Sequence, residues 1–380
     1  MEKKPNLFIH TGTHKTGTTA IQRFLKANRK AFERKGFGIA GLTRSERAQI
    51  KQSADDIQEN AKTTEGYDPI KESILRCKSK CRKRLHSFII SWEGFSGNNR
   101  SGYSNAKNYA DFIGSYESEF NVKSITFFRR QDDFIESMYV QNVKQGYSET
   151  FDHYLEHIDP NGFNWLSITQ AWETALGQDN VCIARYEQER FEDRTSILKQ
   201  FINFLGLDPE PFNLFATNKP FSISNPGWPR HITEITRELN PSIPSERRDQ
   251  YIRSVESLMH KSPNDQYSYL TPTNRKKLLL KFRNSNLTLA QERFGEQCQE
   301  LFKGEDIFSS QALTSTSQPV HCANERDDLL KIILEMVLNF EHACKSTDAA
   351  QKKIQAKKST PPAINYLKKF STCVAKAHES

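Results

Sequence analysis

The sequence has no long apolar run, and this absence excludes several classes of protein. No stretch approaches the roughly 18 apolar residues that a membrane-spanning helix needs, so we expect no transmembrane segment. Near the amino end, Leu7-Phe8-Ile9 is too short for the apolar core of a signal peptide, and no small-residue cleavage site follows it. We therefore expect a cytoplasmic protein, and peripheral contact with a membrane is left open.

Cysteine is also scarce and scattered. The seven cysteines are an odd number spread over the whole chain, which predicts reduced thiols and not a disulfide framework. Cys77 and Cys81 would lie one helical turn apart, but no second Cys or His pair is near them in sequence. A structural zinc site needs four ligands, so the sequence predicts no metal site.

Positive charge is unevenly distributed along the chain. The net charge is +8, and residues 345–380 contain eight lysines against two acidic residues, Asp348 and Glu379. Most of the basicity is thus a property of a C-terminal tail and not of a groove on the folded body, and we expect no nucleic-acid partner. A second basic cluster, at residues 76–84, is interpreted as a solvated helix face, with an anion-attracting rim of the functional site as the alternative. No feature of the sequence indicates an oligomeric state.

Apolar and charged residues are present in the proportions of an ordinary folded protein, 36% and 26%. Apolar runs predict strands at residues 4–10, 37–40, 85–91, 122–128 and 181–186. Helical spacing predicts helices at 18–36, 105–116, 132–144, 165–176, 197–205, 246–259 and 274–294. This alternation predicts an α/β fold, with a parallel sheet flanked by helices and joined by right-handed crossovers. We assign 1–300 to this domain, 301–327 to a linker and 328–380 to a helical, Lys-rich C-terminal extension.

A candidate phosphate-binding loop lies between the first predicted strand and the first predicted helix. It reads Gly12-Thr13-His14-Lys15-Thr16-Gly17-Thr18-Thr19. The first N–H groups of a helix have no intrahelical partner, and the helix dipole adds partial positive charge there, so an anion is favoured. The two glycines allow the backbone to wrap closely around phosphate oxygens. The spacing of these glycines matches a P-loop, but Thr18 stands where the P-loop signature requires lysine.

The loop resembles the 5'-phosphosulfate loop of sulfotransferases that use 3'-phosphoadenosine-5'-phosphosulfate (PAPS). Their pattern, Lys-Ser/Thr-Gly-Thr-Thr, is matched at every position by Lys15-Thr16-Gly17-Thr18-Thr19. The resemblance implies a P-loop-like sulfotransferase fold in which these five residues bind the donor. It also implies PAPS as co-substrate, adenosine 3',5'-bisphosphate as product, and no metal.

A second site is predicted for the 3'-phosphate of the donor. Arg129 ends a predicted strand, and Ser137 follows eight residues later on the next helix. A guanidinium fork with a hydroxyl suits a phosphate monoester, and the sulfotransferase family carries the same strand–Arg–x7–Ser–helix pattern. Arg130 is an alternative to Arg129 or an addition to it. Asp132 and Asp133 are interpreted as acids at the start of that helix.

The resemblance covers roughly residues 5–210. It includes the predicted strand that ends in Tyr186-Glu187 and the helix that ends in Leu205-Gly206-Leu207. The late Gly-rich segment of aryl-type sulfotransferases is not found. Its absence favours the bacterial or glycan-type branches of the family.

In-line sulfuryl transfer needs a base, a cation at the leaving phosphate and donors for the sulfate oxygens. Lys15 is the candidate cation. Glu93, which follows a predicted strand, is the first candidate for the base, because strand carboxyl ends line the ligand crevice of open α/β sheets. His14 is the alternative base or a donor to a sulfate oxygen. His10 is interpreted as a core residue.

These patterns predict a PAPS-dependent sulfotransferase whose acceptor is a carbohydrate or glycolipid. Whether oxygen or nitrogen is sulfated stays open. The acceptor cleft is expected from residues 41–80, 145–165 and 210–300, which contain no recognisable motif. Two other hypotheses are a P-loop kinase for a small molecule and a non-enzymatic protein that binds adenosine 3',5'-bisphosphate or a polyanion.

Overall fold

The computed structural model describes residues 3–58, 67–159, 162–186, 195–214, 228–259 and 268–305. The chain divides into two compact units. The first comprises residues 1–139, 151–227 and 268–312, and the second comprises 140–150, 228–267 and 313–380. Beyond residue 305, the predicted linker and the predicted C-terminal extension lie outside the described residues.

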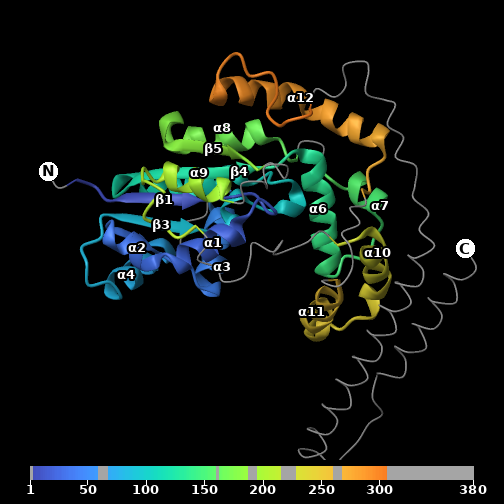
Figure 1. The fold of residues 1–380 in the computed structure, drawn as a ribbon, viewed down its shortest axis with the longest axis horizontal. Helices are drawn as coiled ribbons and strands as arrows, with labels where there is room; N and C mark the ends of the chain where they lie inside the picture. Colours follow the sequence, from blue (N-terminus) through green and yellow to red (C-terminus); the bar gives the residue numbers. More distant parts are fainter. Residues whose placement is uncertain are drawn as a thin grey trace, which may run out of the picture. The chain divides into compact units, whose positions relative to one another are not determined.

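The first unit contains a five-stranded parallel sheet in the order β2-β3-β1-β4-β5 (Figure 1). The strands are β1 (Asn6–His10), β2 (Phe37–Ile39), β3 (Ser87–Ser91), β4 (Asn121–Phe128) and β5 (Val181–Arg185). They read as apolar runs because helices cover both faces of a parallel sheet. All five predicted strands and the α/β fold class are confirmed.

Helices connect these strands or follow the last of them. In the first unit they are α1 (Thr18–Ala27), α2 (Arg29–Arg34), α3 (Arg44–Gln58), α4 (Pro69–Ser79), α5 (Ala106–Gly114), α7 (Phe151–Glu156), α8 (Trp165–Leu176), α9 (Ser196–Phe204) and α12 (Pro272–Phe294). Helix α6 (Gln131–Lys144) begins in the first unit, and its last residues belong to the second. Helices α3 and α7 were not predicted, and of α4 only the end, within the basic cluster at 76–84, was interpreted as helical.

The single helix predicted over residues 18–36 is wrong, because the chain forms two helices that meet at Asn28. The Asn28 amide donates to the carbonyls of Phe24 and Asn213, both at 3.1 Å, and its Oδ1 accepts the Asn213 N–H at 3.0 Å. An asparagine side chain that bonds to main-chain groups competes with the helical ladder. The break therefore depends on a partner 185 residues away in the sequence.

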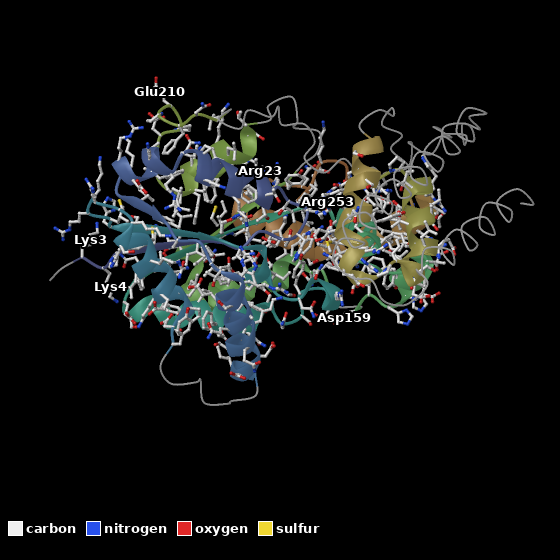
Figure 2. All side chains as sticks on the ribbon, turned by 90° about the horizontal axis from the view of Figure 1, so that it is seen from below. Lys3, Lys4, Arg23, Asp159, Glu210 and Arg253 are labelled. Carbon is white, nitrogen blue, oxygen red and sulfur yellow. The ribbon has the colours of Figure 1, made fainter. Side chains whose placement is uncertain are left out.

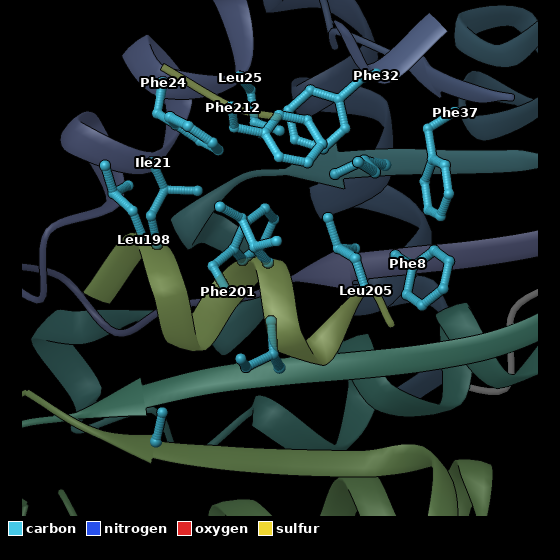
Figure 3. Packing of buried hydrophobic residues seen from close by; sticks show 14 of the residues in the cluster. Phe8, Ile21, Phe24, Leu25, Phe32, Phe37, Leu198, Phe201, Leu205 and Phe212 are labelled. Carbon is cyan, nitrogen blue, oxygen red and sulfur yellow. The ribbon is translucent and has the colours of Figure 1, made fainter. Parts of the chain in front are cut away.

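One face of the sheet is covered by α1, α2 and α9, which share an apolar core with the strands (Figure 3). In this view α1 contributes Ile21, Phe24 and Leu25, and α9 contributes Leu198 and Phe201. All five are at most 2% exposed. Burial of a large apolar side chain stabilises the fold by about 1.5–3 kcal/mol each, so this core fixes α1 firmly on the sheet.

The other face is covered by α5 and α8, and α3 packs against α5. The indole of Trp165 stacks on Phe128 of β4 with ring centroids 4.9 Å apart. Connections between strands on one face of the sheet run toward one edge, and those on the other face run toward the opposite edge. The β1-to-β2 connection runs along the α1 face, whereas the β3-to-β4 and β4-to-β5 connections run the opposite way along the α8 face. All crossovers therefore have the same hand, as parallel sheets require.

This topology has a switch point between β1 and β4. The chain leaves β1 toward one edge of the sheet, and it leaves the adjacent β4 toward the other edge on the opposite face. In open α/β sheets, ligands bind at the carboxyl ends of the two strands where the direction reverses. The loops that follow β1 and β4 thus flank the expected ligand crevice.

The second unit contains α10 (Arg230–Leu239) and α11 (Arg248–Met259). Its core joins Trp228, Ile232 and Val255. Lys144 is buried, pairs with Glu256 at 2.9 Å and lies 4.5 Å from the centre of a Trp228 ring. Burial lowers the pKa of Lys144, and the Glu256 carboxylate opposes that shift. The helix predicted at 246–259 is confirmed by α11, whereas α10 was not predicted.

Residues 80–84 of the basic cluster lead into the amino end of β3, so this part of the cluster lies at the amino edge of the sheet, whereas Arg76 donates to the Gly41 carbonyl at 2.8 Å, beyond the carboxyl end of β2. The carboxyl edge, which carries the candidate loop, is the opposite one, so for residues 80–84 the interpretation as a rim of that site is wrong. Lys3 and Lys4 precede β1 at the amino edge (Figure 2). Arg76 forms a bidentate pair with the buried Glu46 at 2.7 and 2.8 Å, which makes it a structural residue.

In the part of the chain that the structure describes, no helix combines the length and the apolar character needed to cross a membrane.

Candidate functional site

The loop after β1 continues along β4 before it turns. The Thr11 N–H donates to the Ile125 carbonyl at 3.1 Å, and the Thr13 hydroxyl donates to the Phe127 carbonyl at 2.9 Å. These bonds extend the β1–β4 contact beyond the end of β1. They bring residues 14–17 beside the carboxyl end of β4.

The loop then adopts an uncommon backbone shape. Lys15 has φ of 62° and Gly17 has φ of 82°, both in the left-handed region. A non-glycine residue there costs about 1–2 kcal/mol. The buried Thr16 hydroxyl donates to the Thr13 carbonyl and holds the turn from inside. Backbone strain of this kind is typical of functional sites, so the conformation of Lys15 points to a role for it.

The amino end of α1 offers an anion site. Gly17 is its N-cap and supplies no side chain to cap the first-turn N–H groups. The Thr18 hydroxyl is buried and has no hydrogen-bond partner among the described residues. Thr19, the next residue, is exposed. An uncapped helix end beside an unsatisfied hydroxyl is chemically suited to phosphate or sulfate oxygens.

Arg129 and Gly17 both lie beside the ring of Tyr186. The Tyr186 N–H donates to the Phe128 carbonyl at 2.7 Å, and the Arg129 guanidinium carbon lies 5.9 Å from the centre of the Tyr186 ring. A Cβ added to Gly17 would lie 3.3 Å from that ring and 2.7 Å from Ile197 Cδ1. Position 17 therefore requires glycine for space as well as for backbone conformation. The ring links the loop to the arginine that follows β4.

Arg130 has a different environment. Its Nε and Nη2 donate to the two oxygens of Asp132 at 2.7 and 2.9 Å, and Arg275 pairs with the same carboxylate. Asp132 is fully buried. Burial alone would raise the pKa of Asp132, but the hydrogen bonds and charge of Arg130, with the charge of Arg275, outweigh it and lower that pKa. Arg130 is thus engaged in a structural ion pair.

Ser137 lies in the second turn of α6 and is partly buried. It shares a helix face with Asp133, four residues earlier. Burial and the Asp132 carboxylate raise the pKa of Asp133, while the charge of Arg129 is one of the influences that lower it. The face of α6 that carries Ser137 therefore begins close to Arg129.

Glu93 begins a 3-10 turn, Glu93–Ser96, two residues after the end of β3, on the other side of β1 from Arg129. The Gln22 amide of α1 donates to Glu93 Oε2 at 3.3 Å and to the Ser91 carbonyl at 3.2 Å. Glu93 is partly exposed. The carboxylate is therefore oriented by the helix whose amino end is the candidate anion site.

His14 is held by Tyr103, which lies between β3 and α5. The Tyr103 hydroxyl is 3.0 Å from the His14 backbone nitrogen and 2.9 Å from His14 Nδ1. Burial lowers the pKa of His14, and the charges of Lys15 and Lys51 act in the same direction, whereas the Glu93 carboxylate opposes them. His14 is thus a neutral imidazole near neutral pH, within electrostatic range of both Lys15 and Glu93.

His10 belongs to the core, as expected. It is fully buried, its Nδ1 is 2.8 Å from the Ser91 hydroxyl, and its ring packs against Phe127 and Phe201. Burial lowers its pKa to about 3.

The sequence reasoning identified the loop residues, Glu93 and Arg129 but missed three neighbours. Gln22 is one turn after Thr18 on the same helix face, and this spacing could have indicated it. Tyr186 stands at the end of a predicted strand, which is a weak indication. Tyr103 has no signal in the sequence, because only the fold brings it to His14.

Comparison with known proteins gives distant matches. No family model matches the chain. An uncharacterized protein of Archaeoglobus fulgidus is 26% identical over 187 residues, which are 49% of this chain and 49% of that protein, so the chain spans about half the length of this curated relative.

Two solved structures are also similar. A sulfotransferase from Alicyclobacillus acidocaldarius is 12% identical, with a TM-score of 0.41 over 77% of this chain and 97% of that chain. The sulfotransferase domain from the curacin biosynthetic pathway is 12% identical, with a TM-score of 0.32 over 74% of this chain and 98% of that chain. At this distance, the function has to be inferred from the residues of the chain itself.

Proposed function

We propose that this protein is a sulfotransferase that moves a sulfuryl group from PAPS to a hydroxyl or amine of an acceptor. One observation carries the proposal. Lys15, in a left-handed conformation after central strand β1, and Arg129, after adjacent strand β4, flank the switch point of the sheet. A cationic group on each side of such a crevice suits a nucleotide that carries an anionic group at each end.

The 5'-phosphosulfate would bind the loop. Lys15 would supply the cation, and the first-turn N–H groups of α1 with the Thr18 hydroxyl would supply hydrogen-bond donors. Thr16 shapes the turn through its own hydroxyl, and the exposed Thr19 is free to face the ligand from outside. Arg129 would bind the 3'-phosphate, with Ser137 as a second donor.

Transfer would be an in-line displacement. The acceptor oxygen or nitrogen forms a bond to sulfur while the bond from sulfur to the bridging phosphate oxygen breaks. The electron pair of that bond stays on the phosphate, where Lys15 stabilises the charge. Glu93 accepts the proton that the acceptor loses. The products are the sulfated acceptor and adenosine 3',5'-bisphosphate.

For the acceptor we propose a carbohydrate or a glycolipid. The support is chemical. Glu93 is a carboxylate in the position of the base, as in the glycan-modifying members of the family that the loop resembles. Transfer of labelled sulfate from PAPS to fractionated glycans and lipids, followed by mass analysis, tests this choice.

Calorimetry with adenosine 3',5'-bisphosphate and with AMP tests the donor site. The bisphosphate should bind and AMP should bind much more weakly, because AMP lacks the group that Arg129 recognises. Lys15→Ala should weaken binding roughly 10- to 100-fold, the loss of one charge-assisted contact. Lys26→Ala, an exposed lysine at the end of α1, is the matched control and should leave binding unchanged. Equal binding of the two ligands would refute the two-ended site.

Two further assays separate the proposal from the other hypotheses. A kinase would be stabilised by Mg²⁺-ATP and not by PAPS. A polyanion-binding protein that relies on its basic tail would lose ligand binding when residues 345–380 are removed, whereas a sulfotransferase would keep donor binding.

A further inference from the structure

The contact between Tyr103 and His14 fixes the positions of two protons. The His14 backbone N–H donates to the Tyr103 hydroxyl oxygen at 3.0 Å. The same oxygen lies 2.9 Å from His14 Nδ1. A tyrosine hydroxyl has one proton to donate, and its oxygen already accepts the backbone N–H.

Burial decides where that proton goes. Tyr103 is 2% exposed, and His14 Nδ1 is the acceptor that the described residues offer to its hydroxyl. Leaving a buried O–H without an acceptor costs about 1–3 kcal/mol. If Nδ1 carried the ring proton instead, two N–H groups would point at one oxygen and the hydroxyl proton would lose its acceptor. The tyrosine therefore donates to Nδ1.

We infer that Tyr103 holds the neutral His14 imidazole in the tautomer that carries its proton on Nε2, so that His14 is a hydrogen-bond donor to the transferring sulfuryl group and not the base. This assignment of a role rests on the proposed sulfotransferase function. Tyr103 is a positioning residue, since it acts through His14. The proton of the acceptor then goes to Glu93, which resolves the choice between the two candidate bases.

Three residues in or next to this contact have a strained backbone conformation. Lys15, Tyr103 and Phe163 are the non-glycine residues with positive φ in the described chain, at 62°, 65° and 59°. They are connected, because Lys15 follows His14, Tyr103 bonds to His14, and the Phe163 N–H donates to the Gly102 carbonyl at 2.9 Å. Three strained residues in one contact network indicate a conformation retained for function.

Aromatic packing keeps the hydroxyl in place. The Tyr103 ring lies 6.0 Å from the rings of Phe134 and Phe163 and 6.3 Å from that of Trp165. The Trp165 indole N–H also donates to the Arg129 carbonyl at 2.9 Å. One aromatic cluster thus supports both the loop after β1, through Tyr103, and the residue after β4.

The charges around His14 agree with a neutral donor. The charges of Lys15 and of Lys51 in α3 disfavour a protonated His14. The Glu93 carboxylate favours protonation, but burial has the larger effect and lowers the pKa of His14. Protonation at Nδ1 would also displace the Tyr103 hydroxyl proton. An Nε2–H group beside Lys15 is chemically matched to an equatorial sulfate oxygen.

Nitrogen-15 NMR of protein labelled at histidine tests the tautomer without any substrate. The His14 signal, assigned by its loss in His14→Gln, should show a pyridine-like Nδ1 and a pyrrole-like Nε2. In Tyr103→Phe the two tautomers should mix. Tyr116→Phe is the matched control, because Tyr116 is buried and donates to Asp68 at 2.7 Å away from the loop. A protonated Nδ1 in the wild type would overturn the inference, even if Tyr103→Phe failed to fold.

Kinetics test the role in transfer. His14→Gln keeps an N–H donor but cannot act as a base, so we expect kcat within about 10-fold of wild type and an unchanged pH profile. His14→Ala should lose about 10²- to 10³-fold, the scale for one donor to a developing charge. Tyr103→Phe should lower kcat by roughly 10-fold or more with little change in KM for the donor. Equal inactivity of His14→Gln and His14→Ala, with an active Glu93→Gln, would make His14 the base.

The two proposals fail separately. If adenosine 3',5'-bisphosphate does not bind, the proposed function is wrong, whereas the NMR signals still decide the tautomer. If the ligand binds and Nδ1 is protonated, the function stands and the role given to Tyr103 is wrong.

Discussion

Gln22 and Glu93 are joined by a hydrogen bond of 3.3 Å from the amide nitrogen to a carboxylate oxygen. Gln22 also donates to the Ser91 carbonyl at 3.2 Å, so its side chain spans the end of β3 and the turn that follows. Helix α1 therefore does two things at once. Its amino end forms the proposed anion site, and its second turn orients the carboxylate proposed as the base.

Replacement of the carboxylate separates catalysis from binding. Glu93→Gln should lower kcat for sulfuryl transfer by about 10²- to 10⁴-fold, because the base is lost. The affinity for adenosine 3',5'-bisphosphate, measured by calorimetry, should stay nearly unchanged. Glu210→Gln, an exposed acid after α9, is the control and should keep wild-type activity (Figure 2). Full transfer activity in Glu93→Gln would show that another group takes the proton.

The amide of Gln22 should matter less than the carboxylate it orients. Gln22→Leu removes the hydrogen bond but keeps an apolar stem, so we expect kcat to fall by roughly 10-fold without a change in donor affinity. Lys26→Leu, on an exposed position of the same helix, tests whether changes in α1 alone affect the rate. A Gln22→Leu enzyme with the wild-type rate would mean that Glu93 is positioned without it.

Substitution of Arg129 should affect ligand affinity, whereas substitution of the neighbouring Arg130 should affect stability. Arg129→Ala should reduce affinity for the bisphosphate by roughly 10- to 100-fold, measured by calorimetry, with little effect on the free energy of unfolding. Arg130→Ala should cost about 3 kcal/mol in urea unfolding, because it removes one of the two arginines that neutralise the buried Asp132. Its folded fraction should bind ligand normally. Reversal of these two phenotypes would assign the phosphate site to Arg130.

Acid should destabilise the protein through His10. Its pKa is lowered to about 3 by burial, whereas in the unfolded chain it is about 6.5, so the unfolded state binds the extra proton first as pH falls. Stability is therefore lost as pH decreases from about 6.5 toward 3, and this residue should contribute about 2 kcal/mol of that loss by pH 5. Urea unfolding at pH 7 and pH 5 measures it. In His10→Gln the difference between the two pH values should shrink by that amount, and an unchanged difference would contradict the assignment.

Much of the fold could be predicted because it depends on local patterns. The five strands are short apolar runs between turn residues, and a parallel sheet buried on both faces produces such runs. The helix after the loop was predicted too long, because Asn213 contributes to the break at Asn28 from far away in the sequence. Helices α3 and α7 and most of α4 were missed, since their positions depend on packing more than on a regular apolar repeat.

The sequence by itself determined the chemistry available to this protein: a glycine-bracketed loop with an early lysine, an arginine at a strand end and a carboxylate after another strand. These are local features, and residue type with strand-to-helix context is enough to indicate them. The tertiary structure decided how they combine. Strand order placed Lys15 and Arg129 at one switch point, Asp132 engaged Arg130, and the loop between β3 and α5 brought Tyr103 to His14. Such choices depend on contacts between residues distant in sequence, where burial of a hydroxyl or a charge selects the partner, and no local pattern records them.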